Sequence, residues 1–179
     1  MALMQLIYCL YTNNKLTASY PTCQQFKDRL AKIVFTGEHV VMFKLHPRLE
    51  SDCIPVREMT SSQLLLIGDA RYPWFILVPT IPDIRELHDL AQEDLQHVLN
   101  DMMIVSKAVK KIYNPDKINI GALGNIVDQL HIHIIARLIN DDTWPGPVWG
   151  YGNALHYEEA MLVDTIEFMN ETLEQPDLK

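Results

Sequence analysis

The sequence has few cysteines, and none of them lies at metal-binding spacing. Its three cysteines, Cys9, Cys23 and Cys53, are an odd number, and no Cys-x-x-Cys pair occurs. A disulfide framework or a cysteine-based zinc site needs paired cysteines. Residues 3–10 are mostly apolar, but they lack the basic flank and the small-residue exit of a secretory signal. We therefore expect a protein of the reducing cytoplasm, with secretion as the less favoured alternative.

Long hydrophobic runs are missing as well. The longest apolar stretches have the length of a strand, such as residues 75–78, so we expect no transmembrane helix and no membrane partner. The 7 glycines and 10 prolines follow no repeat, which excludes a collagen-like chain, and 48% hydrophobic residues exclude intrinsic disorder. A chain of 179 residues with this composition is long enough to bury a hydrophobic core.

An excess of positive charge is absent too. The chain has 15 Lys and Arg against 23 Asp and Glu, which gives a formal net charge of -8. Nucleic-acid polymers are bound largely through contacts between cations and phosphates, so we expect no such partner. A small anionic ligand can still bind through local hydrogen-bond donors.

The chain divides into three parts by its patterning. Residues 1–41 differ from the rest and form an N-terminal extension, either genuine or the product of an upstream start. Within it we expect a strand at 3–11 and a short helix at 24–34. Residues 42–150 carry the strongest patterning and form the main domain, whereas 151–179 form a C-terminal helix and tail.

Hydrophobic periodicity predicts the elements of the main domain. Apolar runs at 63–67 and 74–78, joined by a short turn, predict an antiparallel hairpin. Apolar residues at three- and four-residue steps between 95 and 112 predict a long amphipathic helix. Asp89 and Gln92 have capping-box spacing before this helix, and Asn114-Pro115 stops it. Further strands are expected at 118–120 and 127–138, and a closing helix at 158–173.

Gln129, His131 and His133 alternate with apolar residues in the last of these strands. Successive side chains of a strand point to opposite faces, so these three project from one accessible face while Leu130 and Ile132 point into the core. A neutral imidazole is a nucleophile, and an imidazolium is a hydrogen-bond donor to phosphate. The two histidines can therefore divide these roles.

Two other interpretations of the histidine pair stay open. His131 and His133 can be ligands of a metal ion, with further ligands from elsewhere in the chain. They can also be a purely structural pair whose ring nitrogens are satisfied by their neighbours. The further metal ligands would come from His39, His46, His88, His97 or His156.

The segment around these histidines resembles a known family. The run from Gln129 to Ile135 is similar to the His-φ-His-φ-His-φ-φ motif (φ is apolar) of the histidine triad family of nucleotide hydrolases and transferases. The similarity covers about residues 42–150. It is greatest to a bacterial branch whose motif opens with Gln and precedes a Trp-Pro-Gly-Pro-Val-Trp-Gly segment, here residues 144–150. The resemblance implies an α+β fold and a homodimer. The sheet would be antiparallel, with about five strands and a central histidine strand, accompanied by one long helix and a C-terminal helix.

The resemblance also implies a mechanism. His131 takes the position of a nucleophile that attacks an α-phosphorus and forms a nucleotidyl-histidine intermediate, which water or another acceptor resolves. The main-chain carbonyl of Gln129 would hold the His131 ring in the right tautomer, and His133 would contact phosphate oxygens. The reaction would need no cofactor and no metal at the histidines.

Two positions depart from the family pattern. Gln129 replaces the first histidine, and a Gln amide donates hydrogen bonds but releases no proton near pH 7. Trp74 lies where some members have a fourth histidine. Both changes weaken proton delivery to the leaving group, which would fall to His133 or to solvent. They favour the alternative of a nucleotide-binding protein with little or no turnover.

The resemblance further indicates residues that bind the substrate. Asp69 matches a position that binds ribose hydroxyls, Asn119 matches an amide that contacts phosphate, and Asn125 lies in a loop that faces the α-phosphate. Turn chemistry is the alternative role of these three residues. Arg71 is a candidate for a phosphate or base contact, with a surface salt bridge as the alternative that we favour.

The expected function is therefore hydrolysis or nucleotidyl transfer on nucleoside 5′-phosphate conjugates that carry a phosphoanhydride or phosphoramidate bond. The expected partner is the nucleotide or nucleotide conjugate itself. Beyond the motif, we expect Arg137 to face a carboxylate. Trp144 and Trp149 can stack on a base or pack over the end of the histidine strand, and we favour packing or a dimer contact.

Overall fold

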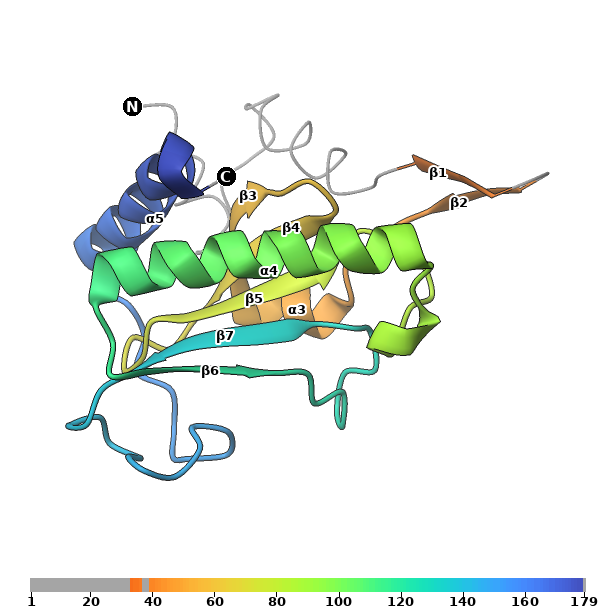
Figure 1. Cartoon of the computed structure of the whole chain (residues 1–179). Helices are drawn as coiled ribbons and strands as arrows, with labels where there is room; N and C mark the ends of the chain where they lie inside the picture. The colour runs from red at the N-terminus through yellow and green to blue at the C-terminus, as the bar shows by residue number, and fades with distance from the viewer. Residues whose placement is uncertain (1–32, 37–38, 179) are drawn as a thin grey trace, which may run out of the picture.

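The fold is built on a five-stranded antiparallel sheet with the strand order β3-β4-β5-β7-β6 (Figure 1). The computed structural model describes residues 33–36 and 39–178. The expected α+β class and the five-stranded antiparallel sheet are confirmed. The histidine strand β7 is an interior strand between β5 and β6, although it is not the middle one. The strands are β3 (Cys53–Glu58), β4 (Ser62–Ile67), β5 (Trp74–Pro79), β6 (Lys117–Gly121) and β7 (Ile132–Arg137).

Two helices cover one face of the sheet. The long helix α4 (Gln92–Tyr113) lies across β5 and β7, and α5 (Glu159–Leu173) packs beside it and against β3 (Figure 1). Leu64 and Leu66 of β4 belong to the core on this face, whereas Leu65 between them belongs to the core on the other face. The short helix α3 (Pro47–Asp52) contributes Leu49 to that second core. This alternation follows from the two-residue period of a strand.

The same alternation places the polar residues of β7. Ile132 and Ile134 are buried in the core under α4 and α5, as predicted. The alternate residues of the strand, His133, Ile135 and Arg137, project toward the opposite face, which the long helices do not cover. The strand therefore carries its chemistry on one side and its helix-packing surface on the other.

The predicted cap of the long helix is wrong. Asp89 belongs to a separate 3-10 helix, Leu87–Asp89, where it forms a capping box with Glu86. The residue before α4 is Ala91, whose side chain makes no capping hydrogen bond. The C-terminal stop is confirmed, because Asn114 adopts a left-handed conformation with φ of 42° directly after the helix. Tertiary packing of the apolar face fixes where this helix begins, since an end cap contributes little by comparison.

Several predicted boundaries also differ from the structure. The strand expected at 127–138 is limited to Ile132–Arg137, and the residues between β6 and β7 form a loop. The edge strand β3 was not predicted, since Pro55 and a register shift between Pro55 and Arg57 interrupt its pattern. The last two residues of the helix expected at 24–34 lie instead in strand β1 (Ile33–Thr36), which pairs with β2 (His39–Met42). The strand expected at 3–11 lies outside the described residues. Among the described helices, none is long and apolar enough to cross a membrane.

Candidate active site

His131 lies in the last residues of the loop that leads into β7, and its ring is held by the main chain. Its Nδ1 lies 2.7 Å from the carbonyl oxygen of Gln129. A carbonyl oxygen only accepts hydrogen bonds, so this contact requires the proton on Nδ1 and leaves a lone pair on Nε2. The contact expected from the family pattern is thus present. It leaves the Nε2 lone pair of His131 available, which nucleophilic attack would require.

The side chain of Gln129 is bound to the backbone of a distant segment. Its Oε1 accepts a hydrogen bond of 2.8 Å from the His46 N–H, and its Nε2 donates one of 2.9 Å to the Lys44 carbonyl. The amide therefore fastens the motif to residues 44–46, ahead of α3. In this structure Gln129 contributes its carbonyl to the site and its side chain to the framework around it.

His133 is enclosed by aromatic rings and carries a specific hydrogen bond. Its Nδ1 accepts from the indole N–H of Trp74 at 2.9 Å, and only 6% of the residue is exposed. Burial, together with the nearby His131, lowers the pKa of His133 to about 3. The indole can only donate, so it acts in the same direction by favouring the neutral ring with its proton on Nε2. His133 is therefore neutral near pH 7 and cannot serve as the imidazolium donor that the motif suggested.

Trp149 completes this aromatic cluster. The centroid of its ring lies 5.6 Å from that of His133 and 6.1 Å from that of Trp74, and both pairs are edge-on. Gly121 of β6 pairs with His133, and a Cβ at this glycine would lie 3.4 Å from the Trp149 ring. This distance is an ordinary van der Waals contact, so the indole lies directly on the strand at Gly121. The predicted packing of Trp149 is confirmed, and it rests on the histidine strand and its neighbour.

A surface pocket opens beside His131. Leu130 donates its N–H to the Ile84 carbonyl at 2.9 Å, which attaches the segment before α4 to the motif. Arg85 from this segment pairs with Asp128 at 2.9 Å and is largely exposed. It brings a permanent positive charge to the pocket, and no sequence signal links it to a motif 46 positions away. The pocket is lined by Arg85, Glu86, Ala122, Leu123, Gly124, Gln129, Leu130 and His131.

Asp69 and Arg71 form an ion pair with each other. Arg71 Nη2 lies 2.6 Å from Asp69 Oδ2, and its Nε contacts both carboxylate oxygens. Asp69 also accepts the N–H of Leu155 at 3.2 Å and is only 3% exposed. Burial on its own would raise the pKa of Asp69, but these hydrogen bonds outweigh burial and lower it. The salt bridge of Arg71 is present, although its partner Asp69 is buried rather than at the surface, whereas a ligand contact of Arg71 and ribose binding by Asp69 stay predictions.

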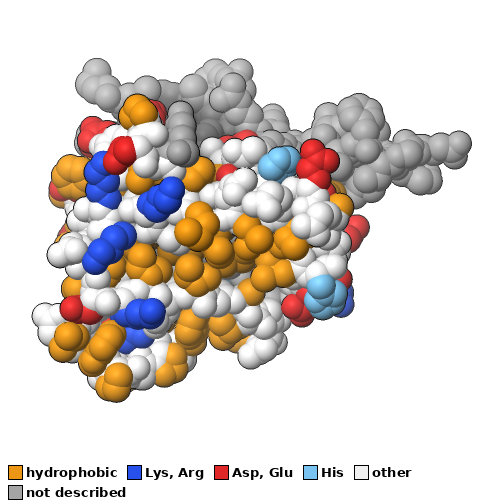
Figure 2. All heavy atoms as spheres, in the orientation of Figure 1, with side chains coloured by type: hydrophobic (Ala, Val, Ile, Leu, Met, Phe, Trp, Pro, Cys, Tyr) orange, Lys and Arg blue, Asp and Glu red, His pale blue; other side chains and the backbone are white. Residues whose placement is uncertain are grey.

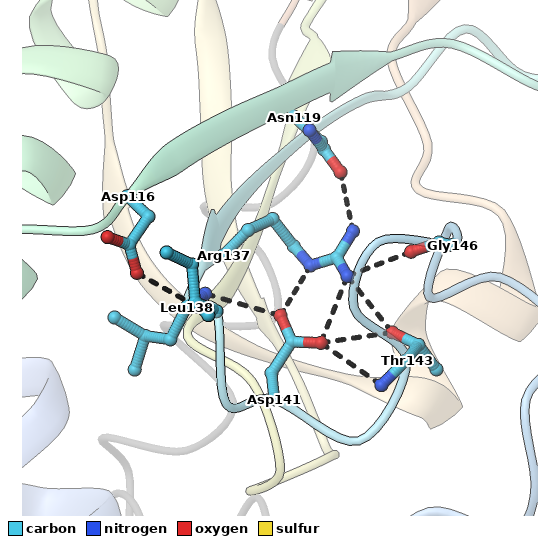
Figure 3. A network of polar contacts seen from close by, with 8 residues as sticks. Asp116, Asn119, Arg137, Leu138, Asp141, Thr143 and Gly146 are labelled. Carbon is cyan, nitrogen blue, oxygen red and sulfur yellow. Dashed lines mark hydrogen bonds and ion pairs between the residues drawn. The ribbon is translucent and has the colours of Figure 1, made fainter.

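Arg137 lies at the far end of β7 in a closed polar network (Figure 3). Its guanidinium makes two parallel contacts of 2.7 and 3.0 Å with Asp141, as expected from a facing carboxylate. It also donates to Asn119 Oδ1 at 2.7 Å, to Thr143 Oγ1 at 3.1 Å and to the Gly146 carbonyl at 2.8 Å. Only 1% of Arg137 is exposed. The network anchors the segment that leads to Trp149, and it occupies the amide oxygen of Asn119.

Two further interpretations concern the loop residue Asn125 and a metal ion bound at the histidines. Asn125 is exposed in the loop between β6 and β7, next to Gly124, whose φ of 70° suits glycine. Its contact with an α-phosphate stays a prediction. Within residues 33–36 and 39–178, no three His, Cys, Asp or Glu side chains gather to hold a metal ion. His46 instead accepts the Arg48 N–H at the start of α3.

Comparison with known proteins agrees with this arrangement. The family profile of the HIT domain matches residues 48–139. The chain belongs to the histidine triad family. A solved histidine triad protein from Bradyrhizobium japonicum is 40% identical, over 73% of this chain and 98% of that one, with a TM-score of 0.72.

Two more histidine triad structures are similar to this chain. The protein from Sinorhizobium meliloti is 43% identical, covers 73% of this chain and 96% of its own, and has a TM-score of 0.71. The protein from Marinobacter aquaeolei is 38% identical, covers 75% and 98%, and has a TM-score of 0.73. The comparison with curated proteins finds no match. Family membership therefore rests on the HIT domain and on these solved relatives.

Proposed function

We propose that this histidine triad protein is a cytoplasmic nucleotide hydrolase or nucleotidyl transferase with His131 as its nucleophile. The observation that carries the proposal is the 2.7 Å contact between His131 Nδ1 and the Gln129 carbonyl, because it directs the free lone pair of Nε2 away from the main chain. Attack of Nε2 on the α-phosphorus of a nucleoside 5′-phosphate conjugate forms a nucleotidyl-histidine. The carbonyl stabilises the ring while it carries positive charge.

Substrate binding in this proposal draws on residues around the His131 pocket. Arg85 neutralises a phosphate oxygen by exchanging Asp128 for the ligand, and the loop with Asn125 supplies backbone donors. The Nε2–H of His133 donates to a second oxygen. Contact of Asp69 with ribose competes with its ion pair to Arg71, whereas Asn119 can keep its Oδ1 contact with Arg137 and donate from Nδ2 to phosphate.

A second candidate function is nucleotide binding with little or no turnover. The neutral state of His133 and the backbone-bound amide of Gln129 favour it, because neither group delivers a proton readily. The two candidates differ in one chemical species, which is the covalent adduct on His131.

The test is a screen of nucleotide conjugates for turnover, combined with rapid acid-free quenching and mass spectrometry. We expect a nucleotidyl adduct on the peptide that contains His131, and its loss together with turnover in His131→Ala. His156→Ala is the matched control, since that histidine is exposed and lies outside the pocket. Binding without adduct or turnover would establish the second candidate instead.

We also propose that the protein is a homodimer. Strand β6 lies at an edge of the sheet, with Ile120 45% exposed, and Met103 on α4 is 51% exposed. Figure 2 shows hydrophobic side chains gathered across the face that α4 covers. An unpaired edge beside apolar surface is suited to pairing with a second copy. Ile120→Lys should convert the dimer to monomer in sedimentation experiments, whereas Phe168→Lys on α5 should leave it intact.

A further inference from the structure

The proposed function leaves open which bond to the α-phosphorus is broken. A phosphoanhydride or acyl phosphate releases a phosphate or a carboxylate, and both are stable as anions. A phosphoramidate releases an amine, whose nitrogen must gain a proton before or as the phosphorus–nitrogen bond breaks. An enzyme that cleaves such a bond efficiently therefore needs a group that donates this proton. The side chains of the pocket and of the motif are the candidates for this proton donor.

The first motif position supplies no proton. The amide of Gln129 has no acidic proton near neutral pH, and its side chain is bound at both ends to the backbone of residues 44 and 46. Glu86 also lines the pocket, but its carboxylate accepts the N–H of Asp89 in a capping box and so acts as an acceptor. Arg85 stays protonated, and Asp128 is its ion-pair partner.

His133, at the last motif position, supplies no proton either, because Trp74 occupies its Nδ1. The indole N–H points at His133 Nδ1 over 2.9 Å. A second proton on the His133 ring would have to sit on this nitrogen, facing the indole proton with no acceptor between them. His131, Trp74 and Trp149 are the rings around His133, and none of them is an anion that would favour an imidazolium. The ring is also buried, and its low pKa of about 3 agrees with this geometry.

We infer that the leaving group departs as an anion without a proton from the protein, so that the substrates are nucleotide phosphoanhydrides or acyl phosphates rather than phosphoramidates. This inference rests on the proposed function. Trp74 is then a positioning residue for specificity, since its N–H occupies Nδ1 of the buried His133 ring and so adds to burial in favouring the neutral form. With none of the described pocket and motif side chains in place to give this proton, bulk water supplies it, and amine departure is slow.

Formation and hydrolysis of the nucleotidyl-histidine both proceed without an acid from the protein. The lone pair of His131 Nε2 forms a bond to phosphorus, the phosphorus–oxygen bond breaks, and its electron pair leaves on the phosphate or carboxylate. The Nδ1 proton stays in place, hydrogen-bonded to the Gln129 carbonyl. Water then forms a bond to phosphorus, the nitrogen–phosphorus pair returns to Nε2, and the proton lost by water passes to solvent.

The test compares two probes that share one nucleotidyl group. Diadenosine triphosphate carries an anhydride leaving group, and adenosine 5′-phosphoramidate carries an amine. We expect kcat/KM of the wild-type protein for the anhydride to exceed that for the phosphoramidate by at least about 100-fold, the usual effect of a missing general acid. Trp74→Phe removes the indole N–H and should narrow this ratio by at least about tenfold at pH 5.5, with a smaller effect at pH 8.

Trp149→Phe is the matched control. It removes an indole N–H from the same cluster, but this buried N–H has no hydrogen-bond partner among the described residues, whereas the N–H of Trp74 is bonded to His133 Nδ1. The ratio should therefore stay at its wild-type value. Equal rates on both wild-type substrates, or equal effects of Trp74→Phe and Trp149→Phe, would overturn the inference while an adduct on His131 upholds the proposed function. No adduct from either probe would overturn both.

Discussion

The two ends of β7 carry polar groups on the same side of the sheet but use them differently. At the start, His131 has one ring nitrogen bound to the Gln129 carbonyl and lies beside a surface pocket. At the end, Arg137 is 1% exposed and donates to four different partners. One end has a nucleophilic lone pair available, and the other end forms a closed network.

The difference separates the candidate site from the framework that positions it. A buried charge is tolerated only when its partners are complete, and the bidentate contact with Asp141 meets that condition. Burial alone would raise the pKa of Asp141, but the hydrogen bonds from Arg137 and nearby backbone N–H groups lower it to about 2. The network fixes the segment that presents Trp149 to His133. Substitutions at the two ends should therefore affect different measurements.

Removing the nucleophile should have the largest effect on turnover. His131→Ala should lower kcat/KM by at least about 1,000-fold, because no neighbouring group replaces the Nε2 lone pair. The free energy of unfolding should change by less than about 1.5 kcal/mol, since the ring borders a pocket. Steady-state kinetics and urea denaturation of one preparation check both values. A variant that keeps full activity would disprove the mechanism.

Breaking the closed network should have the largest effect on stability. Arg137→Met leaves Asp141 buried and unpaired, and should destabilise the fold by about 3–5 kcal/mol in urea denaturation. Lys111→Met removes an exposed pair with Asp177 and should change the stability by less than about 1 kcal/mol. Similar losses of unfolding free energy in the two variants would show that the buried network stabilises the fold no more than an exposed ion pair does.

The same network predicts a pH dependence. Asp141 has a folded-state pKa below its unfolded value, so its contribution is complete above about pH 4 and is lost as the pH falls toward 2. Asp141→Asn should reduce the stability at pH 7 and flatten this acid limb. If the unfolding free energy of the variant falls as steeply with decreasing pH as that of the wild type, other groups cause the loss of stability in acid.

Arg85 tests whether the open end binds a phosphate. Arg85→Ala should raise KM for a nucleotide conjugate about tenfold and change kcat by less than about threefold, which corresponds to about 1.4 kcal/mol of uniform binding. Arg48→Ala is the matched control, because Arg48 also forms an exposed ion pair with an aspartate. If both variants behave alike, the charge at position 85 has no part in binding.

The smallest effect is expected at Gln129. Gln129→His keeps the main-chain carbonyl, and a neutral imidazole can both accept from the His46 N–H and donate to the Lys44 carbonyl. We expect activity to stay within about threefold of wild type or to rise. Loss of all activity would show that the amide has a specific role in the reaction.

Particular residues show how far sequence reasoning reached. Alternation placed Ile132 in the core and His133 on the opposite face, and the structure agrees, because both lie in β7 and a strand has a two-residue period. The expected accessibility of the two histidines is wrong, since His131 in the preceding loop is 8% exposed and His133 only 6%. The edge strand β3 was missed, since a proline and a register shift disrupt the pattern on which such predictions depend. The cap at Asp89 was misplaced, because its carboxylate accepts the N–H groups of Arg85 and Glu86 at the start of the 3-10 helix before α4.

The sequence by itself determined the family, the antiparallel α+β class, the long helix and the position of the histidine motif, because these depend on periodicity and on a short contiguous motif. Only the tertiary structure decided which groups those residues meet. It brought the Trp74 indole to His133, attached Gln129 to residues 44–46, placed Arg85 beside His131 and occupied Asp69 and Asn119 with arginines. The partners lie far apart along the chain, and hydrogen bonding between distant side chains is set by packing rather than by local spacing.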